Sequence, residues 1–423
     1  MKTTLFFLLL AAQSFASDLA LRPPSFRVPE GLAVFTDFTQ AKYEITYDYL
    51  KKEALVTSRI VLETAEAGHP VFDLVGEPLE LTIDGIPATA PVKSTPDNVT
   101  KIRVISKKVD AGRHVVVIKS SISELVSFTA AGVNNGFWMD DLKDRSYLEK
   151  YLPSNLMYDR IPMEFNVTVL NALSKQSVYT NGVTERTGDN KFKITFPRSF
   201  NASSPFFHLV PTESVFETKF NYKSIDGREL PVLIYFKKEL SPSPELRFER
   251  LKRKTLAVMN ELERDYGAFP HPAMTIYMVA DGGMEYAGAT LTSEANLAHE
   301  IFHSYFARGV MPADGNASWI DEALATWRDD GYKTLPALPT GVQLMKRGPY
   351  FRYTDLLAYG FGGKFFAYLS GKVGDLRPFM RVLLEKKTLT PFTLDEFITE
   401  MSSFYAQDLS PEFAKLGVIP SKN

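Results

Sequence analysis

Cysteine is missing from all 423 residues of the chain. Its absence excludes disulfides, thiolate metal ligands and a cysteine nucleophile. A metal ion bound by side chains would therefore need histidine, aspartate or glutamate ligands. Histidine is also scarce, with six in the chain, so two histidines at a ligand spacing form a more specific signal here than in a histidine-rich protein.

The sequence also lacks an excess of either charge. The formal net charge is −2 and the sequence pI is about 6.4, so no basic field is present to attract nucleic acid or anionic lipid. Apolar residues make up 45% and charged residues 23%, which is typical of a soluble globular protein. The length suffices for two or three domains.

Long apolar runs are absent except at the N-terminus, which reads MKTTLFFLLLAAQSFAS. One lysine precedes an apolar run from Leu5 to Ala12, and small residues follow at Ser14 and Ala16. This order predicts a signal peptide over residues 1–16 and export to the periplasm or the extracellular medium. No later stretch has the length of a transmembrane helix, so we expect no membrane span.

Strand patterns fill the first half of the chain. KYEITYDY places Tyr43, Ile45 and Tyr47 on one face of a strand, and similar alternation continues to about residue 217. A helix should then follow Ser243, with Pro244 at its first position and an end at Gly267. We predict an α+β, multidomain fold, with an N-terminal antiparallel β-sandwich over residues 17–217 and a mostly helical domain over residues 218–423.

The segment HEIFHSYFARGVMPADGNASWIDEALATW begins at His299. A helix that starts at Ser293 or Asn296 and stops by Gly309 would place His299 and His303 on one face, one turn apart, close enough to bind one zinc ion.

A catalytic zinc needs a third protein ligand. Ser318 and Asp321 resemble a capping box that opens a second helix, which puts Glu322 in its first turns as the third ligand. Glu300 would lie beside the metal, where a carboxylate can take a proton from water. The alternative is that two helices carry these residues by chance.

This stretch resembles the gluzincin aminopeptidases, the family of aminopeptidase N, whose pattern is HExxH, eighteen residues and then glutamate. His303 and Glu322 have eighteen residues between them, and WIDEALA from residue 319 to 325 is in register with a family motif. One departure is Ala307-Arg308, where the family has Gly-Asn. The resemblance implies one Zn²⁺ per chain and a saddle-shaped N-terminal domain followed by a thermolysin-like catalytic domain.

Two further segments carry the resemblance. Gly282-Gly283-Met284-Glu285 is similar to the family's Gly-x-Met-Glu-Asn motif, which implies that Glu285 holds the substrate's free α-amino group and that the neighbouring backbone pairs with the peptide. YGFGGKFFAYL is similar to the family's Tyr-x-x-Gly helix start, which implies that Tyr359 stabilises the oxyanion. Tyr353 and Tyr350 are its rivals.

The sequence thus favours an exported zinc peptidase that acts on peptides, most simply an aminopeptidase. Two alternatives stay open: an endopeptidase of the same clan, and a binding or scaffold protein that keeps the fold without turnover. The chain has no room for the family's large C-terminal helical domain, so we expect a short form with a less enclosed site. The oligomeric state does not follow from the sequence.

Overall fold

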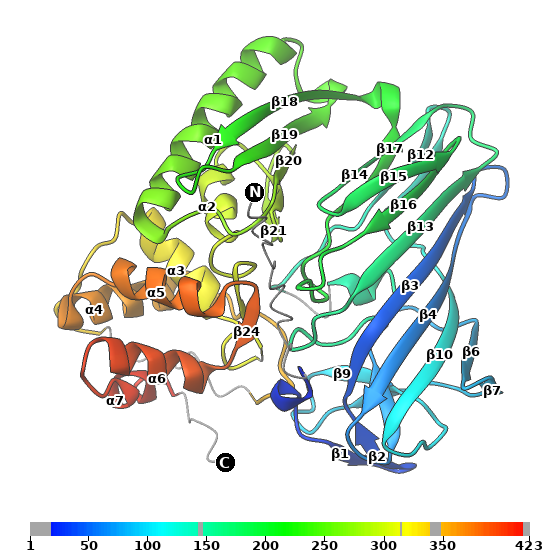
Figure 1. Cartoon of the computed structure of the whole chain (residues 1–423), viewed down its shortest axis with the longest axis horizontal. Coiled ribbons are helices and arrows are strands. Elements are labelled where there is room, and N and C mark those ends of the chain that lie inside the picture. The colour runs from blue at the N-terminus through cyan, green and yellow to red at the C-terminus, as the bar shows by residue number, and fades with distance from the viewer. Residues whose placement is uncertain (1–17, 143–146, 314, 339–347, 418–423) are drawn as a thin grey trace, which may run out of the picture.

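The computed structural model describes residues 18–142, 147–313, 315–338 and 348–417. The predicted signal peptide lies outside these residues. Sheets of the first half of the chain form one side of the molecule, and a further sheet with most of the helices forms the other (Figure 1). The prediction of an α+β, multidomain protein is confirmed at this level. Within the described residues, no helix combines the length and the apolar character needed to cross a bilayer.

The largest sheet has eight strands in the order β15-β16-β13-β3-β4-β10-β6-β7. Its buried face includes Tyr43, Ile45 and Tyr47 of β3, all fully buried, as the alternation predicted. Strands β3 and β13 pair in parallel, so the expectation of an antiparallel sheet is wrong for this pair of strands. β13 reaches β3 only after a long excursion through other strands, which leaves its direction free. The bounds are Val183–Gly188, Lys191–Thr195, Met163–Leu170, Thr36–Asp48, Glu53–Thr64, Gly112–Ser121, Glu80–Ile83 and Ile86–Pro87.

Two smaller sheets complete the first half of the chain. One has the order β1-β2-β5-β9-β8 and the other the order β11-β12-β17-β14. The strands of the first are Phe26–Val28, Gly31–Val34, His69–Phe72, Lys101–Val104 and Val92–Ser94, and those of the second are Val126–Thr129, Gly132–Gly136, Phe207–Pro211 and Gln176–Thr180. The short helices η1 to η4 span Asp18–Leu21, Leu148–Lys150, Thr212–Ser214 and Lys238–Leu240.

The second half is built on a five-stranded sheet in the order β18-β19-β20-β22-β21. Ile234 and Phe236 of β19 pack into the core beneath the helices, whereas Tyr235 between them packs into the core of the N-terminal sheets. Because successive side chains point to opposite faces, this one sheet joins the two halves. Its strands are Val215–Lys223, Glu229–Lys237, Met274–Met278, Ala289–Thr292 and Gly283–Tyr286, and a two-stranded sheet pairs Val310–Pro312 (β23) with Thr390–Phe392 (β24).

Helix α1 spans Pro244–Tyr266 and ends at Gly267, whose φ of 104° favours glycine, so the helix predicted from the sequence is confirmed. Ser243 occupies the N-cap position, but its side chain makes no capping hydrogen bond. The remaining helices are α2 Leu297–Phe302, α3 Ile320–Asp329, the π-helical turn η5 Ala358–Gly362, α4 Gly363–Val373, α5 Arg377–Lys387, α6 Leu394–Phe404 and α7 Ser410–Ala414.

His208 on β17 makes the joint between the two halves sensitive to acid. Its ring is fully buried among aromatic rings, Nδ1 lies 3.1 Å from the Tyr235 hydroxyl, and Nε2 has no hydrogen-bond partner. Burial, followed by the charge of Lys237, lowers the pKa of His208 to about 3. The folded protein therefore holds this ring neutral where the unfolded chain, with a histidine pKa of about 6.5, binds a proton.

We expect the free energy of unfolding to fall as pH drops below about 6.5, by up to about 1.4 kcal/mol per pH unit from His208 until its folded-state pKa is reached. The His208→Asn variant keeps a polar group near Tyr235 but cannot titrate. Denaturant unfolding at pH 7 and pH 4.5 should show a smaller loss in this variant than in the wild type. Equal losses in the two proteins would contradict the prediction.

Candidate active site

Three predicted metal ligands come together at one point. His299 lies on α2, His303 is the residue that ends α2, and Glu322 lies in the first turn of α3. One ligand atom from each of the three lies within 4.8 Å of the others. Helix α2 ends at Phe302, so the prediction of a helix that continues towards Gly309 was too long, although the two histidines still share a face.

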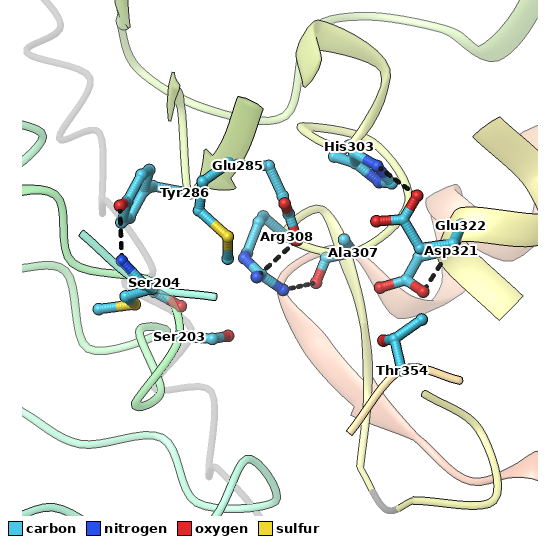
Figure 2. A network of polar contacts seen from close by, with 12 residues as sticks. Ser203, Ser204, Glu285, Tyr286, His303, Ala307, Arg308, Asp321, Glu322 and Thr354 are labelled. Atoms are coloured by element: carbon cyan, nitrogen blue, oxygen red, sulfur yellow. Dashed lines mark hydrogen bonds and ion pairs between the residues drawn. The ribbon is translucent and has the colours of Figure 1, made fainter. Parts of the chain in front are cut away.

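Both imidazole rings are held so that Nε2 faces the carboxylate of Glu322. Nδ1 of His303 lies 3.1 Å from the Phe306 carbonyl oxygen and Nδ1 of His299 lies 2.6 Å from Asp329 Oδ2, so each Nδ1 donates to an oxygen. Nε2 of His299 lies 3.0 Å from Glu322 Oε2. Nε2 of His303 is buried and pairs with the same oxygen at 3.4 Å (Figure 2).

This arrangement fits a divalent cation. A neutral imidazole that donates through Nδ1 presents a lone pair at Nε2, and here two such lone pairs face a carboxylate oxygen. A positive charge must lie between them, as protons or as a metal ion. Two histidines and one carboxylate, with the second ring nitrogens bonded to oxygen, are the usual protein ligands of catalytic zinc.

The pKa values of these side chains reflect the same attraction. Burial lowers the pKa of His299, but hydrogen bonds with Asp329 and Glu322 outweigh burial and raise it to about 9. Burial alone would raise the pKa of Glu322, and the two histidines reverse this and hold it well below its ordinary value. Zinc binding requires neutral imidazoles, so we expect it to release protons.

The predicted capping box at the start of α3 is wrong. The N-cap residue is Trp319, and no side chain caps the helix. The Ser318 hydroxyl instead donates to the Gly315 carbonyl oxygen, and the Ser318 carbonyl accepts a hydrogen bond from Thr354. Asp321 Oδ1 accepts from the Glu322 backbone N–H. Glu322 still lies in the first turn, because α3 starts only one residue later than a Ser318 cap would place it.

Sequence reasoning missed Asp329, which orients His299. Asp329 lies seven positions after Glu322 on α3, which is two helical turns, so both carboxylates face the same way. Glu322 reaches Nε2 of His299 and Asp329 reaches Nδ1, and together they fix the imidazole ring from both sides. The spacing of the two acids on one helix was the available signal.

The Asp329→Asn variant should bind zinc about 10- to 100-fold more weakly than the wild type, because carboxylate partners of ligating histidines have effects of this size. Asp330, an exposed neighbour in the sequence, supplies the control Asp330→Asn. Competition with a chromogenic chelator would measure the affinity, with thermal unfolding as a check on the fold. Equal zinc affinities of the two variants would refute the role of Asp329.

Glu300, the predicted base, lies in α2 beside the ligands with its carboxyl group buried. Oε2 has no hydrogen-bond partner, and burial raises the pKa of Glu300 to about 8. The side chain faces β21: a Cβ atom on Gly283 would lie 2.0 Å from Glu300 Oε1. Gly283 must therefore be glycine for Glu300 to occupy this position.

Strand β21 carries the predicted substrate-binding residues and forms the edge of its sheet. It contains Gly283, Met284 and Glu285 and pairs on one side with β22, while Gly282 precedes it with a φ of 86°. The Met284 side chain is buried in the core that extends from the N-terminal sheets. An edge strand offers unpaired backbone groups to an extended peptide.

Tyr286, where the family has asparagine, connects this strand to the N-terminal half through hydrogen bonds of its hydroxyl group. It is fully buried, its hydroxyl donates to the Phe137 carbonyl oxygen, and it accepts from the Met139 backbone N–H. It is therefore part of the joint between the two halves of the chain.

Of the three candidate tyrosines, Tyr359 packs beside a predicted ligand. It belongs to the π-helical turn η5, and its ring lies nearly parallel to the His299 ring at 6.2 Å. Burial and then the charges of Glu322 and Asp141 raise its pKa above the ordinary value. Tyr350 instead donates to the Pro24 carbonyl oxygen and packs with the N-terminal sheets.

The packing of η5 explains the glycine of the Tyr-x-x-Gly pattern. A Cβ atom on Gly362 would lie 2.5 Å from the Ala323 Cβ of α3. The turn that carries Tyr359 can therefore lie directly against the helix that carries Glu322 only if this residue is glycine.

Glu285 has a partner that sequence reasoning did not anticipate. Arg308 donates through Nη2 to Glu285 Oε1 at 2.7 Å, and both side chains are buried. Two further buried acids, Asp141 and Asp321, lie in the same region: burial and the charge of Glu285 raise the pKa of Asp141, and burial and the charge of Glu322 raise that of Asp321 to about 7. Asp141 comes from the N-terminal half, so its place could not be inferred from sequence spacing.

No protein-family model matches the sequence, and no match was found among curated proteins. Solved structures do match. The M1 zinc metallopeptidase of Deinococcus radiodurans is 16% identical at a TM-score of 0.61, over 91% of this chain and 95% of that one. Legionella pneumophila aminopeptidase A, in complex with aspartic acid, is 16% identical at a TM-score of 0.63 over 90% of this chain and 49% of that one, so this chain spans about half its length.

Yeast LTA4 hydrolase, in complex with bestatin, is 12% identical at a TM-score of 0.63, over 91% of this chain and 67% of that one. Identities this low establish a shared fold. The resemblance to the gluzincin aminopeptidases is thus confirmed at the level of the overall multidomain fold, and the chain has the fold of the M1 zinc metallopeptidases.

Proposed function

We propose that this protein is a zinc-dependent peptidase that removes N-terminal residues from peptides. The observation that carries the proposal is the convergence of His299, His303 and Glu322 with Glu300 buried beside them. Each histidine donates through Nδ1 to an oxygen and turns Nε2 towards Glu322, which a chance arrangement of two helices would not require.

Bound zinc would supply a Lewis acid that polarises the scissile carbonyl and makes water more acidic. Glu300 takes the proton from the attacking water and returns it to the amine that leaves when the peptide bond breaks. Tyr359 donates its hydroxyl hydrogen to the oxyanion that develops on the former carbonyl oxygen.

The substrate lies along β21 in this proposal. The backbone of Gly282, Gly283 and Met284 pairs with the extended peptide, and the Glu285 carboxylate accepts a hydrogen bond from the α-amino group. The buried position of Glu300 against Gly283 supports this arrangement, because it brings the base next to the strand that the peptide would join.

The structural neighbours support the same assignment, since they are a zinc metallopeptidase and an aminopeptidase. We further propose that residues 17–217 form the saddle-like β-sandwich of that fold and residues 218–423 its thermolysin-like domain. Residues 1–16 would direct export to the periplasm or the extracellular medium. N-terminal sequencing of the protein from the cells that make it tests the last point, and a mature chain that begins at Met1 would contradict it.

Hydrolysis of a panel of aminoacyl arylamides tests the proposed activity. We expect cleavage by the zinc-loaded protein, loss of cleavage with 1,10-phenanthroline and recovery after zinc is restored. N-acetylation of the best substrate should abolish its cleavage. Cleavage of acetylated peptides at internal bonds would point to an endopeptidase, whereas a protein that binds zinc but cleaves nothing would point to a scaffold.

A further inference from the structure

Arg308 is a buried cation that lies against the proposed substrate anchor. Its side chain is 1% exposed and that of Glu285 is 4% exposed. Nη2 donates to Glu285 Oε1 at 2.7 Å, and Nη1 donates to the Ala307 carbonyl oxygen at 3.3 Å. Figure 2 shows the guanidinium between these two acceptors. The pair is removed from solvent, so its energy depends on good geometry rather than on screening.

The backbone before Arg308 is strained. Ala307 has a φ of 148°, a region that favours glycine and costs other residues about 1–3 kcal/mol. The turn is completed by a hydrogen bond from the Arg308 N–H to the His303 carbonyl oxygen. Strain of this kind persists where the surrounding contacts hold the backbone in one conformation. The strained residue here immediately precedes Arg308, which bonds to Glu285.

The charges nearby explain why Glu285 needs this partner. Asp141 and Asp321 are buried in the same region, and burial together with neighbouring acids disfavours their charged forms. Burial lowers the pKa of Arg308, but Glu285 and the other acids outweigh burial and raise it, so the arginine stays charged. A charged arginine that bonds directly to Glu285 also offsets the repulsion between this carboxylate and the neighbouring acids.

Arg308 engages one oxygen of Glu285 and leaves the other. Among the residues that the structure describes, Oε2 of Glu285 has no hydrogen-bond partner. We propose that Arg308 is a positioning residue that holds the Glu285 carboxylate in place, so that Oε2 accepts a hydrogen bond from the α-amino group of the peptide. The inference rests on the proposed aminopeptidase function and assigns a role to a residue that departs from the family's Gly-Asn pattern.

The test compares two inhibitors of the zinc-loaded protein: leucine hydroxamate and the same hydroxamate without its amino group. The ratio of their inhibition or dissociation constants measures what the amino group contributes to binding. Arg308→Met should reduce this ratio about 10- to 100-fold, the range expected for a hydrogen bond to a charged group. Arg308→Lys should restore part of it. Binding of the hydroxamate without the amino group, and zinc content, should stay unchanged.

Glu285→Gln should reduce the ratio as Arg308→Met does. The ratio of the double variant should be little lower than that of either single variant, because both changes disrupt the same interaction with the amino group. Arg103→Met is the control: Arg103 is as buried as Arg308, bonds to the Leu74 carbonyl oxygen and pairs with the exposed Glu77 in the N-terminal half, so its loss should lower stability and leave the ratio unchanged.

An unchanged ratio in Arg308→Met would overturn the proposal. A raised ratio would overturn it as well, since it would mean that Arg308 only neutralises Glu285. A wild-type protein that binds both hydroxamates equally would also refute it while leaving a zinc enzyme in place. If neither hydroxamate binds, the peptidase assignment itself fails, and this inference fails with it.

Discussion

Replacing Glu300 by glutamine should lower kcat by about a thousandfold or more, the upper part of the range for loss of a general base. Glutamine has the shape of glutamate, so it should keep the packing of residue 300 against Gly283. It cannot accept the proton of water. Because Glu300 is beside the ligand cluster and not one of its three members, zinc should remain bound in the variant.

The measurement pairs turnover of the best aminoacyl arylamide with zinc content determined by mass spectrometry. Glu294→Gln is a matched control, because Glu294 precedes the same helix but bonds to Arg250 at the surface. The control should retain wild-type turnover. A Glu300→Gln variant that keeps more than about a tenth of the wild-type rate would remove Glu300 from the mechanism, and a variant that loses zinc would give it a structural role.

The part of the site that could be predicted from sequence is the part set by local geometry. His299 and His303 are four positions apart, which brings them to one face of a helix whatever surrounds it. The exact length of that helix was not needed: α2 ends at Phe302 and does not continue towards Gly309, yet the two histidines still share a face. Glu322 depended on a second helix and on the family resemblance, because eighteen intervening residues fix no distance by themselves.

What could not be predicted depends on contacts between distant segments. Asp141 belongs to the N-terminal half, yet it lies among the acids of the site, where burial and the charge of Glu285 raise its pKa. Arg308 was visible as a departure from the family pattern, but its pairing with Glu285 follows only from the fold, since β21 and the turn after α2 meet in space.

The same limit explains the errors in the fold. The alternation of apolar and polar residues identified β3 and its buried tyrosines correctly, because alternate residues of a strand point to the same face of the sheet. The same pattern does not indicate which strand is the neighbour, so the parallel pairing of β3 with β13 was not predicted. The capping box failed for a related reason: the Ser318 hydroxyl has an acceptor in the Gly315 carbonyl oxygen, which the spacing of Ser318 and Asp321 does not reveal.

Replacing Tyr359 by phenylalanine should lower kcat by about 100- to 1,000-fold with little change in KM, because the hydroxyl acts on charge that develops only in the transition state. Steady-state kinetics on the same arylamide would measure both constants. Zinc content should be that of the wild type, since the predicted ligands are His299, His303 and Glu322.

Tyr350→Phe and Tyr353→Phe separate Tyr359 from its rivals. The Tyr350 hydroxyl donates to the Pro24 carbonyl oxygen, so its removal should reduce thermal stability and leave kcat within a few-fold of the wild type. Tyr353 packs against Phe351 and should behave in the same way. A large fall in kcat for either variant, with Tyr359→Phe near the wild-type rate, would transfer the oxyanion role to that tyrosine. The ring of Tyr359 lies nearly parallel to that of His299 and close to the charge of Glu322, so this residue lies beside the predicted ligands, where the carbonyl oxygen of a bound peptide must gain charge.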